Sequence, residues 1–382
     1  MTPAAVRPLT VLQVITQRRF SGAECICLWL SSALQARGHR VVLACKPGAM
    51  MHNAAVDRGL EVHLPAMSGK LNFPAPFRLA HLAREVGADV IHTHLSSASL
   101  WGGLAGRIAG VPVVSHVHAL NSPFPYRRAS LIVTCSEGVR AHLIARGLPE
   151  DRVRAVLNGV DPLRLDDLAP PGQVRAELGI PPDAPVVGCV AHLSPKKGQE
   201  YLLRAVAALA PRWPQLQCLL VGEGPMQRQL EGLAWKLGIA DRFRLPGYRP
   251  DAMSLMNVMD VVVLPQVAKE GLGLALVEAA LLGKPTVASD APGITEALAA
   301  DETGLLFPPG DAEALAGCLD RLLSDAALRH RLGSAGRERA LRIFALDTMA
   351  ERIEGLYYEV LSAAPACHSE EAPEGRTEES RR

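Results

Sequence analysis

Two glutamates separated by seven residues form the most distinctive chemical motif of this sequence. Glu270 and Glu278 belong to the segment EGLGLALVEA, which follows an apolar run ending at Pro265. The glycines of the segment let the backbone turn tightly beside a ligand. The helix expected from about Gly273 offers free N–H groups to an anion. The two carboxylates are suited to binding hydroxyl groups, although a loop carboxylate and a helix charge that complements the dipole would give the same spacing.

A basic turn, AHLSPKKG, follows the apolar run Val186–Val190. It contains His192, Lys196 and Lys197, and lysine beside glycine at a strand-to-helix turn can contact a diphosphate. The Walker A pattern is absent. A solvated basic turn is the competing interpretation.

The loop expected after the first strand is built from small residues. It contains Ser21, Gly22 and Glu24. Small residues there leave the start of a helix open to a phosphate. Ser21 and Glu24 also fit a capping box, and both interpretations can hold together.

Four histidines lie at the ends of two strands that we expect to be neighbours: His92, His94, His116 and His118. Residues i and i+2 of a strand share a face, and few acidic ligands lie nearby. We therefore favour a histidine that binds a substrate hydroxyl over a zinc site, with packed structural histidines as the alternative. D-x-D, the carboxylate pair that holds a metal in many sugar-nucleotide enzymes, does not occur.

Short apolar runs alternate with helix-like segments along the chain, which predicts βαβ units and parallel sheets. A cluster of prolines and aspartates at 161–185 indicates a boundary between two domains. We predict an N-terminal domain at 1–165, a C-terminal domain at 166–345, a helix at 346–365 that crosses back, and a disordered tail at 366–382.

The composition of the chain argues against several classes of protein. The chain has 382 residues and a net charge of +1, without the basic excess of a nucleic-acid-binding protein, so no nucleic acid is expected as a partner. The sequence has eight cysteines and no C-x-x-C motif, which indicates that the cysteines are core residues of a protein in a reducing compartment. No apolar run is long enough for a transmembrane helix. We expect a cytoplasmic protein that can contact the inner face of the cytoplasmic membrane.

Taken in order, these motifs resemble glycosyltransferase family 4 over about residues 9–358. Further segments carry the resemblance: Asp89–His94, Val113–His118, Val133–Ser136, Leu157–Asp161, Leu220–Pro225, Gly293–Glu296 and Thr303–Leu306. The resemblance implies an α/β fold of GT-B architecture, with two Rossmann-like domains whose parallel sheets face an interdomain cleft. It also implies a retaining transfer from a nucleoside-diphosphate sugar to a glycan or lipid-linked acceptor, with no metal and no other cofactor.

The same resemblance assigns roles to individual residues. It implies that His118 and Glu270 are catalytic. The residues expected to bind the donor are Gly22, His192, Lys196, Lys197, Gly271, Leu272, Gly273, Leu274 and Glu278. The residues expected on the acceptor side are Arg18 and His94, within a domain whose basic and aromatic loops could touch a membrane.

Two departures from the family pattern keep other functions open. Ser21 stands where the family often has glycine, and His192 stands where it usually has arginine. They favour, as one alternative, a degenerate nucleotide-binding partner subunit; the other alternative is a nucleotide-sugar epimerase of GT-B fold. For the transfer itself, same-face attack by the acceptor competes with double displacement through Glu270.

Overall fold

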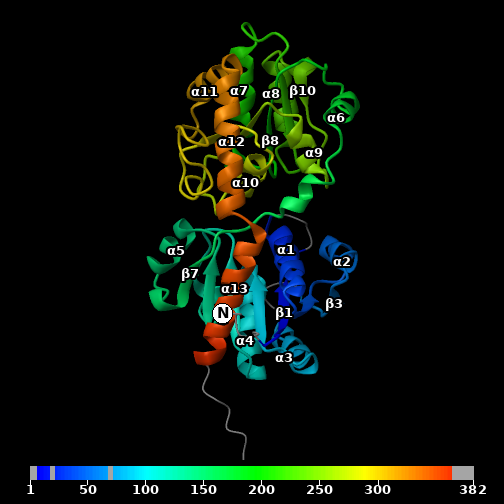
Figure 1. Cartoon of the computed structure of the whole chain (residues 1–382), viewed down its shortest axis with the longest axis vertical. Helices are drawn as coiled ribbons and strands as arrows, with labels where there is room; N and C mark the ends of the chain where they lie inside the picture. Colours follow the sequence, from blue (N-terminus) through cyan, green and yellow to red (C-terminus); the bar gives the residue numbers. More distant parts are fainter. Residues whose placement is uncertain (1–6, 18–21, 68–71, 364–382) are drawn as a thin grey trace, which may run out of the picture.

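Two parallel sheets organise the chain, and they occupy the two lobes that follow one another along the long axis (Figure 1). The computed structural model describes residues 7–17, 22–67 and 72–363. Arg18 and Ser21 lie outside the described residues, as does the predicted tail.

The first sheet has seven strands in the order β3-β2-β1-β4-β5-β6-β7. In chain order they are β1 (Thr10–Ile15), β2 (Arg40–Ala44), β3 (Glu61–His63), β4 (Val90–His94), β5 (Val113–Val117), β6 (Leu131–Thr134) and β7 (Val153–Ala155). Every residue of β4 and β5 is buried. Burial on both faces extends to the polar residues of these strands, which are His92, Thr93, His94, Ser115 and His116.

Five α-helices and three short 3₁₀ turns accompany this sheet: α1 (Gly22–Ala36), α2 (Met50–Val56), α3 (Ala75–Glu85), α4 (Leu95–Ala109), α5 (Glu137–Ile144), η1 (Phe124–Tyr126), η2 (Glu150–Arg152) and η3 (Pro162–Leu165). Helix α4 begins at Leu95, directly after β4. Leu95 has a φ of 69°, so the chain turns from β4 into α4 without a loop. Such a φ is strained for a branched side chain.

The second sheet has six strands in the order β10-β9-β8-β11-β12-β13. They are β8 (Val186–Val190), β9 (Gln217–Val221), β10 (Phe243–Arg244), β11 (Val261–Leu264), β12 (Thr286–Ser289) and β13 (Gly304–Phe307). Its helices are α6 (Pro171–Glu177), α7 (Gln199–Leu209), α8 (Gln227–Lys236), α9 (Ala252–Asn257), α10 (Leu274–Leu281), α11 (Ala312–Ser324) and α12 (Ala326–Ile343), with η4 (Pro195–Lys197) and η5 (Ala240–Arg242).

The last helix, α13 (Leu346–Ala363), returns to the first lobe and packs against α1 (Figure 1). Tyr357 and Ile353 of α13 belong to the core of the first domain. The same core continues into the second domain through Leu276 and Val277 of α10. The two lobes therefore share apolar surface. The residue limits predicted for the domains remain a prediction.

Both sheets reverse their strand order at one point, between β1 and β4 and between β8 and β11. This is the Rossmann-like arrangement that the sequence predicts. Ligands of such sheets bind beyond the carboxyl ends of the strands at the reversal. No helix within 7–17, 22–67 or 72–363 has the length and apolar character needed to cross a membrane.

Candidate functional site

Lys197 and Glu270 form an ion pair at the strand reversal of the second sheet. Lys197 ends η4, after β8, and Glu270 follows β11; the Lys197 ammonium donates to the Glu270 carboxylate. It also donates to Gln266 Oε1 at 2.8 Å, and the Gly271 amide donates to Glu270 at 3.0 Å. Burial raises the pKa of Glu270, but Lys197 and these hydrogen bonds together hold that pKa below its usual value. Glu270 is therefore a carboxylate at neutral pH.

Gln266 is a site residue that the sequence analysis missed. Its side chain is buried, and its NH₂ group donates to the carbonyls of Ala268 at 3.0 Å and Lys269 at 3.2 Å. It thus holds the loop before Glu270 in place while it accepts from Lys197. Its position two residues after the end of β11 was the available signal.

The glycine turn after Glu270 is pressed against the first domain. A Cβ at Gly271 would lie 2.2 Å from the His118 carbonyl oxygen, so only glycine permits this approach. The Ser136 hydroxyl donates to the Gly271 carbonyl at 2.6 Å. Gly273 has a φ of 79° and precedes α10. The described residues of the two domains are thus in direct contact at the predicted site.

Gly22 and Leu274 also meet across the domains. A Cβ at Gly22 would lie 3.5 Å from Leu274 Cδ2, which is an ordinary contact distance. Leu272, between the two glycines, is buried. The start of α1 therefore faces the start of α10.

Glu278 has a partner that the sequence analysis did not foresee. Arg164 in η3 donates to the Glu278 carboxylate, and its guanidinium lies 4.7 Å from the centroid of the Trp29 ring. This arrangement joins α1, the segment between the domains, and α10. A ligand hydroxyl that binds Glu278 must share the carboxylate with Arg164 or displace it.

Two further residues of the basic turn between β8 and α7 are predicted to bind the donor. These residues, His192 and Lys196, are exposed. The His192 carbonyl accepts from the Gln199 side chain at 3.0 Å. Gly198, with a φ of 63°, closes the turn where a Cβ would lie 1.9 Å from the Pro265 carbonyl oxygen. The backbone of the turn is fixed, while both basic side chains face solvent.

The four histidines lie together at the carboxyl ends of β4 and β5. His94 pairs with His116 in the register of the two strands. The rings of His92 and His94 stack with centroids 4.6 Å apart and planes 8° apart, and those of His116 and His118 lie 4.2 Å apart. Burial lowers the pKa of His118 to about 3 and lowers the pKa of the other three well below the usual value. All four rings are therefore neutral.

Hydrogen bonds tie the cluster to its surroundings. His94 Nδ1 lies 3.0 Å from His118 Nε2, and His94 Nε2 lies 2.9 Å from Gln13 Oε1. His92 Nδ1 is hydrogen-bonded to the Tyr357 hydroxyl of α13. Both ring nitrogens of His94, the predicted acceptor residue, are thus engaged within the protein.

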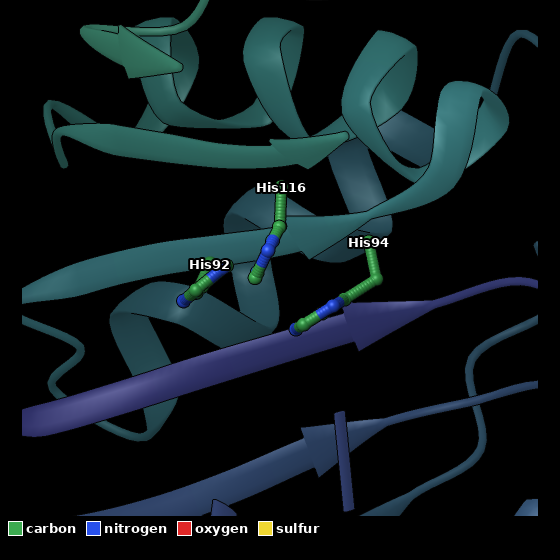
Figure 2. A group of neighbouring side chains, drawn as sticks. All are labelled: His92, His94 and His116. Atoms are coloured by element: carbon green, nitrogen blue, oxygen red, sulfur yellow. The ribbon is translucent and has the colours of Figure 1, made fainter. Parts of the chain in front are cut away.

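Three of these rings, those of His92, His94 and His116, are close enough together to be considered as metal ligands (Figure 2). Their ligand atoms lie within 4.8 Å of one another. However, His92 and His94 are nearly parallel, and His92 and His116 are stacked at 25°. Imidazole lone pairs lie in the ring plane, so near-parallel rings direct them side by side rather than toward one ion. The geometry favours stacking and hydrogen bonding over tetrahedral coordination.

Two family descriptions match the chain. Glycosyltransferase Family 4 matches residues 20–164, and Glycosyl transferases group 1 matches residues 172–339. The 2-deoxystreptamine glucosyltransferase of Streptomyces kanamyceticus is 32% identical over 289 residues, covering 67% of this chain and 74% of that protein. The lipopolysaccharide core biosynthesis glycosyltransferase LpsE of Rhizobium meliloti is 28% identical over 349 residues, covering 90% of this chain and 96% of that protein.

Solved structures share the fold. A glycosyltransferase from Rickettsia africae superposes with a TM-score of 0.84 at 20% identity, covering 93% of this chain and 99% of that chain. Anabaena HepE in complex with UDP-glucose superposes with a TM-score of 0.83 at 24% identity, covering 92% and 100%. The chain therefore belongs to glycosyltransferase family 4, and it is a transferase enzyme of GT-B architecture.

Proposed function

We propose that this glycosyltransferase moves a sugar from a nucleoside-diphosphate sugar to a glycan or lipid-linked acceptor, with retention of configuration and without a metal ion. The observation that carries the proposal is the Lys197–Glu270 ion pair beside the amino end of α10, across the domain contact from His118. The ion pair supports the proposal because it joins a cation and a carboxylate next to Gly271, which approaches the His118 carbonyl oxygen of the first domain.

The departing diphosphate gains negative charge in the transition state, and donors fixed in advance act there most strongly. Lys197, the Gly22 amide and the first amides of α10 could supply this stabilisation without a metal. Lys197 would then exchange part of its contact with Glu270 for the diphosphate.

For the sugar, Glu270 would accept from hydroxyl groups and His118 would contact the transferred residue. Glu270 already receives hydrogen bonds from Lys197 and Gly271. This suits a binding role better than attack on the anomeric carbon, and we propose same-face attack by the acceptor. The configuration of the product's new anomeric centre, read from its proton coupling, tests retention.

The names of the relatives support the substrate classes. HepE has been crystallised with UDP-glucose, which supports a nucleotide-sugar donor. LpsE is named for lipopolysaccharide core biosynthesis, which supports a lipid-linked glycan as acceptor.

We also propose that the first domain contacts the inner face of the cytoplasmic membrane. Phe73 and Phe77 are exposed beside Arg78 at the start of α3, and Phe124 of η1 is exposed as well. Helix α4 packs against both α3 and η1. Aromatic and basic side chains together are typical of surfaces that bind anionic lipid.

A thermal-shift panel of UDP, GDP, ADP, dTDP and CDP sugars, with and without EDTA, tests the donor proposal. A ligand that binds only the folded state at 100 times its Kd stabilises it by about 2.7 kcal/mol. We expect a shift with one nucleotide that EDTA does not change. A shift that EDTA abolishes would refute metal independence, and no shift with any sugar nucleotide would refute the donor class.

Lys197→Met and Lys236→Met form a matched pair for this assay. Lys236 is an exposed lysine in the last turn of α8. We expect the ligand-induced shift to disappear in Lys197→Met and to persist in Lys236→Met. Equal shifts in both variants would remove Lys197 from the diphosphate site.

A further inference from the structure

Gln13 is a polar residue in the middle of an apolar strand. It is fully buried in β1, where its Cα pairs with that of His92 in β4. Burying an amide without hydrogen bonds costs free energy, so buried amides are usually bonded. Gln13 Oε1 meets that need at His94 Nε2, 2.9 Å away.

His94, which contacts Gln13, also contacts His118. His94 Nδ1 lies 3.0 Å from His118 Nε2. A neutral imidazole has one N–H donor and one acceptor nitrogen. If His94 Nε2–H donates to the Gln13 oxygen, then His94 Nδ1 must accept, and His118 Nε2–H must be the donor. The structure turns Gln13 Oε1, not the amide nitrogen, toward His94, and that nitrogen has no hydrogen-bond partner among the described residues.

We propose that Gln13 and His94 form a hydrogen-bonded chain that holds His118 as its Nε2-protonated tautomer and leaves the Nδ1 lone pair to accept from a hydroxyl of the transferred sugar. Gln13 and His94 are then positioning residues that act through His118. The proposal rests on the proposed function, because it assumes that His118 contacts the sugar.

The second ring nitrogen of His118 is open to a ligand. His118 Nδ1 is buried and has no hydrogen-bond partner among the described residues, as is also true of His92 Nε2 and both ring nitrogens of His116. A buried polar atom without a partner is costly. A ligand hydroxyl could pair with His118 Nδ1 in either tautomer, so the assignment of the tautomer rests on the contacts to His94 and Gln13.

Long-range ¹H–¹⁵N correlation spectra of ¹⁵N-histidine-labelled protein measure the tautomer directly. The His118 signals are assigned by their loss in His118→Asn. We expect Nε2-protonated His118 in the wild-type chain. A wild-type His118 protonated at Nδ1 would overturn the proposal, and this measurement does not depend on the folding of any variant at position 13.

Gln13→Met removes the acceptor at nearly constant volume. His94 is then free to change tautomer, so we expect mixed or switched His118 signals. We also expect a fall of about tenfold in kcat, in line with the loss of one buried hydrogen bond, with donor KM changed less. Gln13→Glu keeps an acceptor oxygen and should retain the Nε2-protonated form.

Thr93→Val is the matched control. Thr93 lies next to His94 on the opposite face of β4, and its hydroxyl is hydrogen-bonded to Ser99 at 3.0 Å and Ser115 at 2.8 Å. We expect this variant to lose stability without a change in the His118 tautomer. If Gln13→Met folds and keeps both the wild-type tautomer and the wild-type kcat, the chain does not position His118.

These outcomes are separable from the proposed function. The tautomer is read without any substrate, so it can be confirmed even if no sugar transfer is found. Conversely, transfer at the wild-type rate in Gln13→Met would refute the positioning role and leave the transferase intact. One zinc ion per purified chain, bound through the ring nitrogens, would also overturn the hydrogen-bonded chain.

Discussion

The Lys197–Glu270 pair determines the protonation of the site at the scale of single residues. Burial raises the pKa of Glu270. Lys197 and the neighbouring hydrogen-bond donors lower this pKa by more, so that it lies below the usual 4.5. The stabilisation from this pairing is therefore present above the unfolded pKa and is lost as the pH falls through the lower folded pKa.

Lys197→Met should reverse the sign of this pKa shift. With the cation gone, burial is less opposed, so the pKa of Glu270 should rise. We expect the acid limb of the pH profile of kcat/KM to move to higher pH, on top of a loss of at least tenfold in kcat/KM if Lys197 contributes one charged hydrogen bond to the transition state.

The measurement is a pH series of kcat/KM for the wild-type chain, Lys197→Met and Lys236→Met. Lys236→Met removes an exposed lysine of α8 and should reproduce the wild-type acid limb. An acid limb that does not move in Lys197→Met would mean that Glu270 does not govern it.

At the scale of elements, the start of α5 contacts Gly271 and Glu296 of the second domain. Ser136 caps α5 by accepting from the Val139 amide at 3.2 Å and donates to the Gly271 carbonyl at 2.6 Å. The Glu296 carboxylate accepts from the amides of Glu137 and Gly138, both at 2.8 Å. Because a trans peptide places C=O and N–H on opposite sides, the Ser136 bond directs the Leu272 amide away from the first domain.

Ser136→Ala should therefore affect both stability and transfer. Loss of the cap lowers the free energy of unfolding by about 1 kcal/mol, and loss of the second bond frees the peptide that follows Gly271. We expect a lower melting temperature together with a severalfold loss of kcat/KM. Thermal unfolding and initial rates measure the two effects.

Asp325→Ala is the matched cap variant. Asp325 accepts from the Leu328 amide at 2.8 Å at the start of α12, and it takes no part in the bond between Ser136 and Gly271. It should lower stability to a similar degree and leave kcat/KM unchanged. Equal kinetic losses in both variants would show that Ser136 acts only as a cap.

At the scale of the whole molecule, the chain passes between the lobes twice at one place. Val160 and Ala345 form a parallel bridge, with the Val160 amide donating to Phe344 at 2.8 Å and the Leu346 amide donating to Val160 at 3.1 Å. A Cβ at Gly159 would lie 2.7 Å from Leu346 Cα. The crossing is therefore closely packed on backbone atoms.

Gly159→Ala should force the two passages apart. Overpacking of this kind costs about 1 to 3 kcal/mol, so we expect a lower melting temperature and weaker coupling between the lobes in calorimetry. Gly355→Ala, in α13 with nothing within 4 Å of its Cβ, should instead raise stability by up to about 1 kcal/mol. A Gly159→Ala protein as stable as wild type would show that the crossing can relax.

The sequence by itself determined the alternation of strands and helices. Short apolar runs predicted the central strands, and the turns after them predicted where Lys197 and Glu270 lie, while their role in binding a phosphate stays a prediction. The strands β3, β7, β10 and β13 were not predicted. The first three have only two or three residues, which show no periodicity, and all four are stabilised by pairing with a neighbouring strand.

Only the tertiary structure decided which of these residues are partners. Lys197 meets Glu270 over 73 positions, Arg164 meets Glu278 over 114, and Ser136 meets Gly271 over 135. Gln13 could not be recognised in the sequence, since its role depends on His94, 81 positions away. Local periodicity records which face of an element is buried, whereas the strand order of the two sheets and their contact determine which strand ends come together.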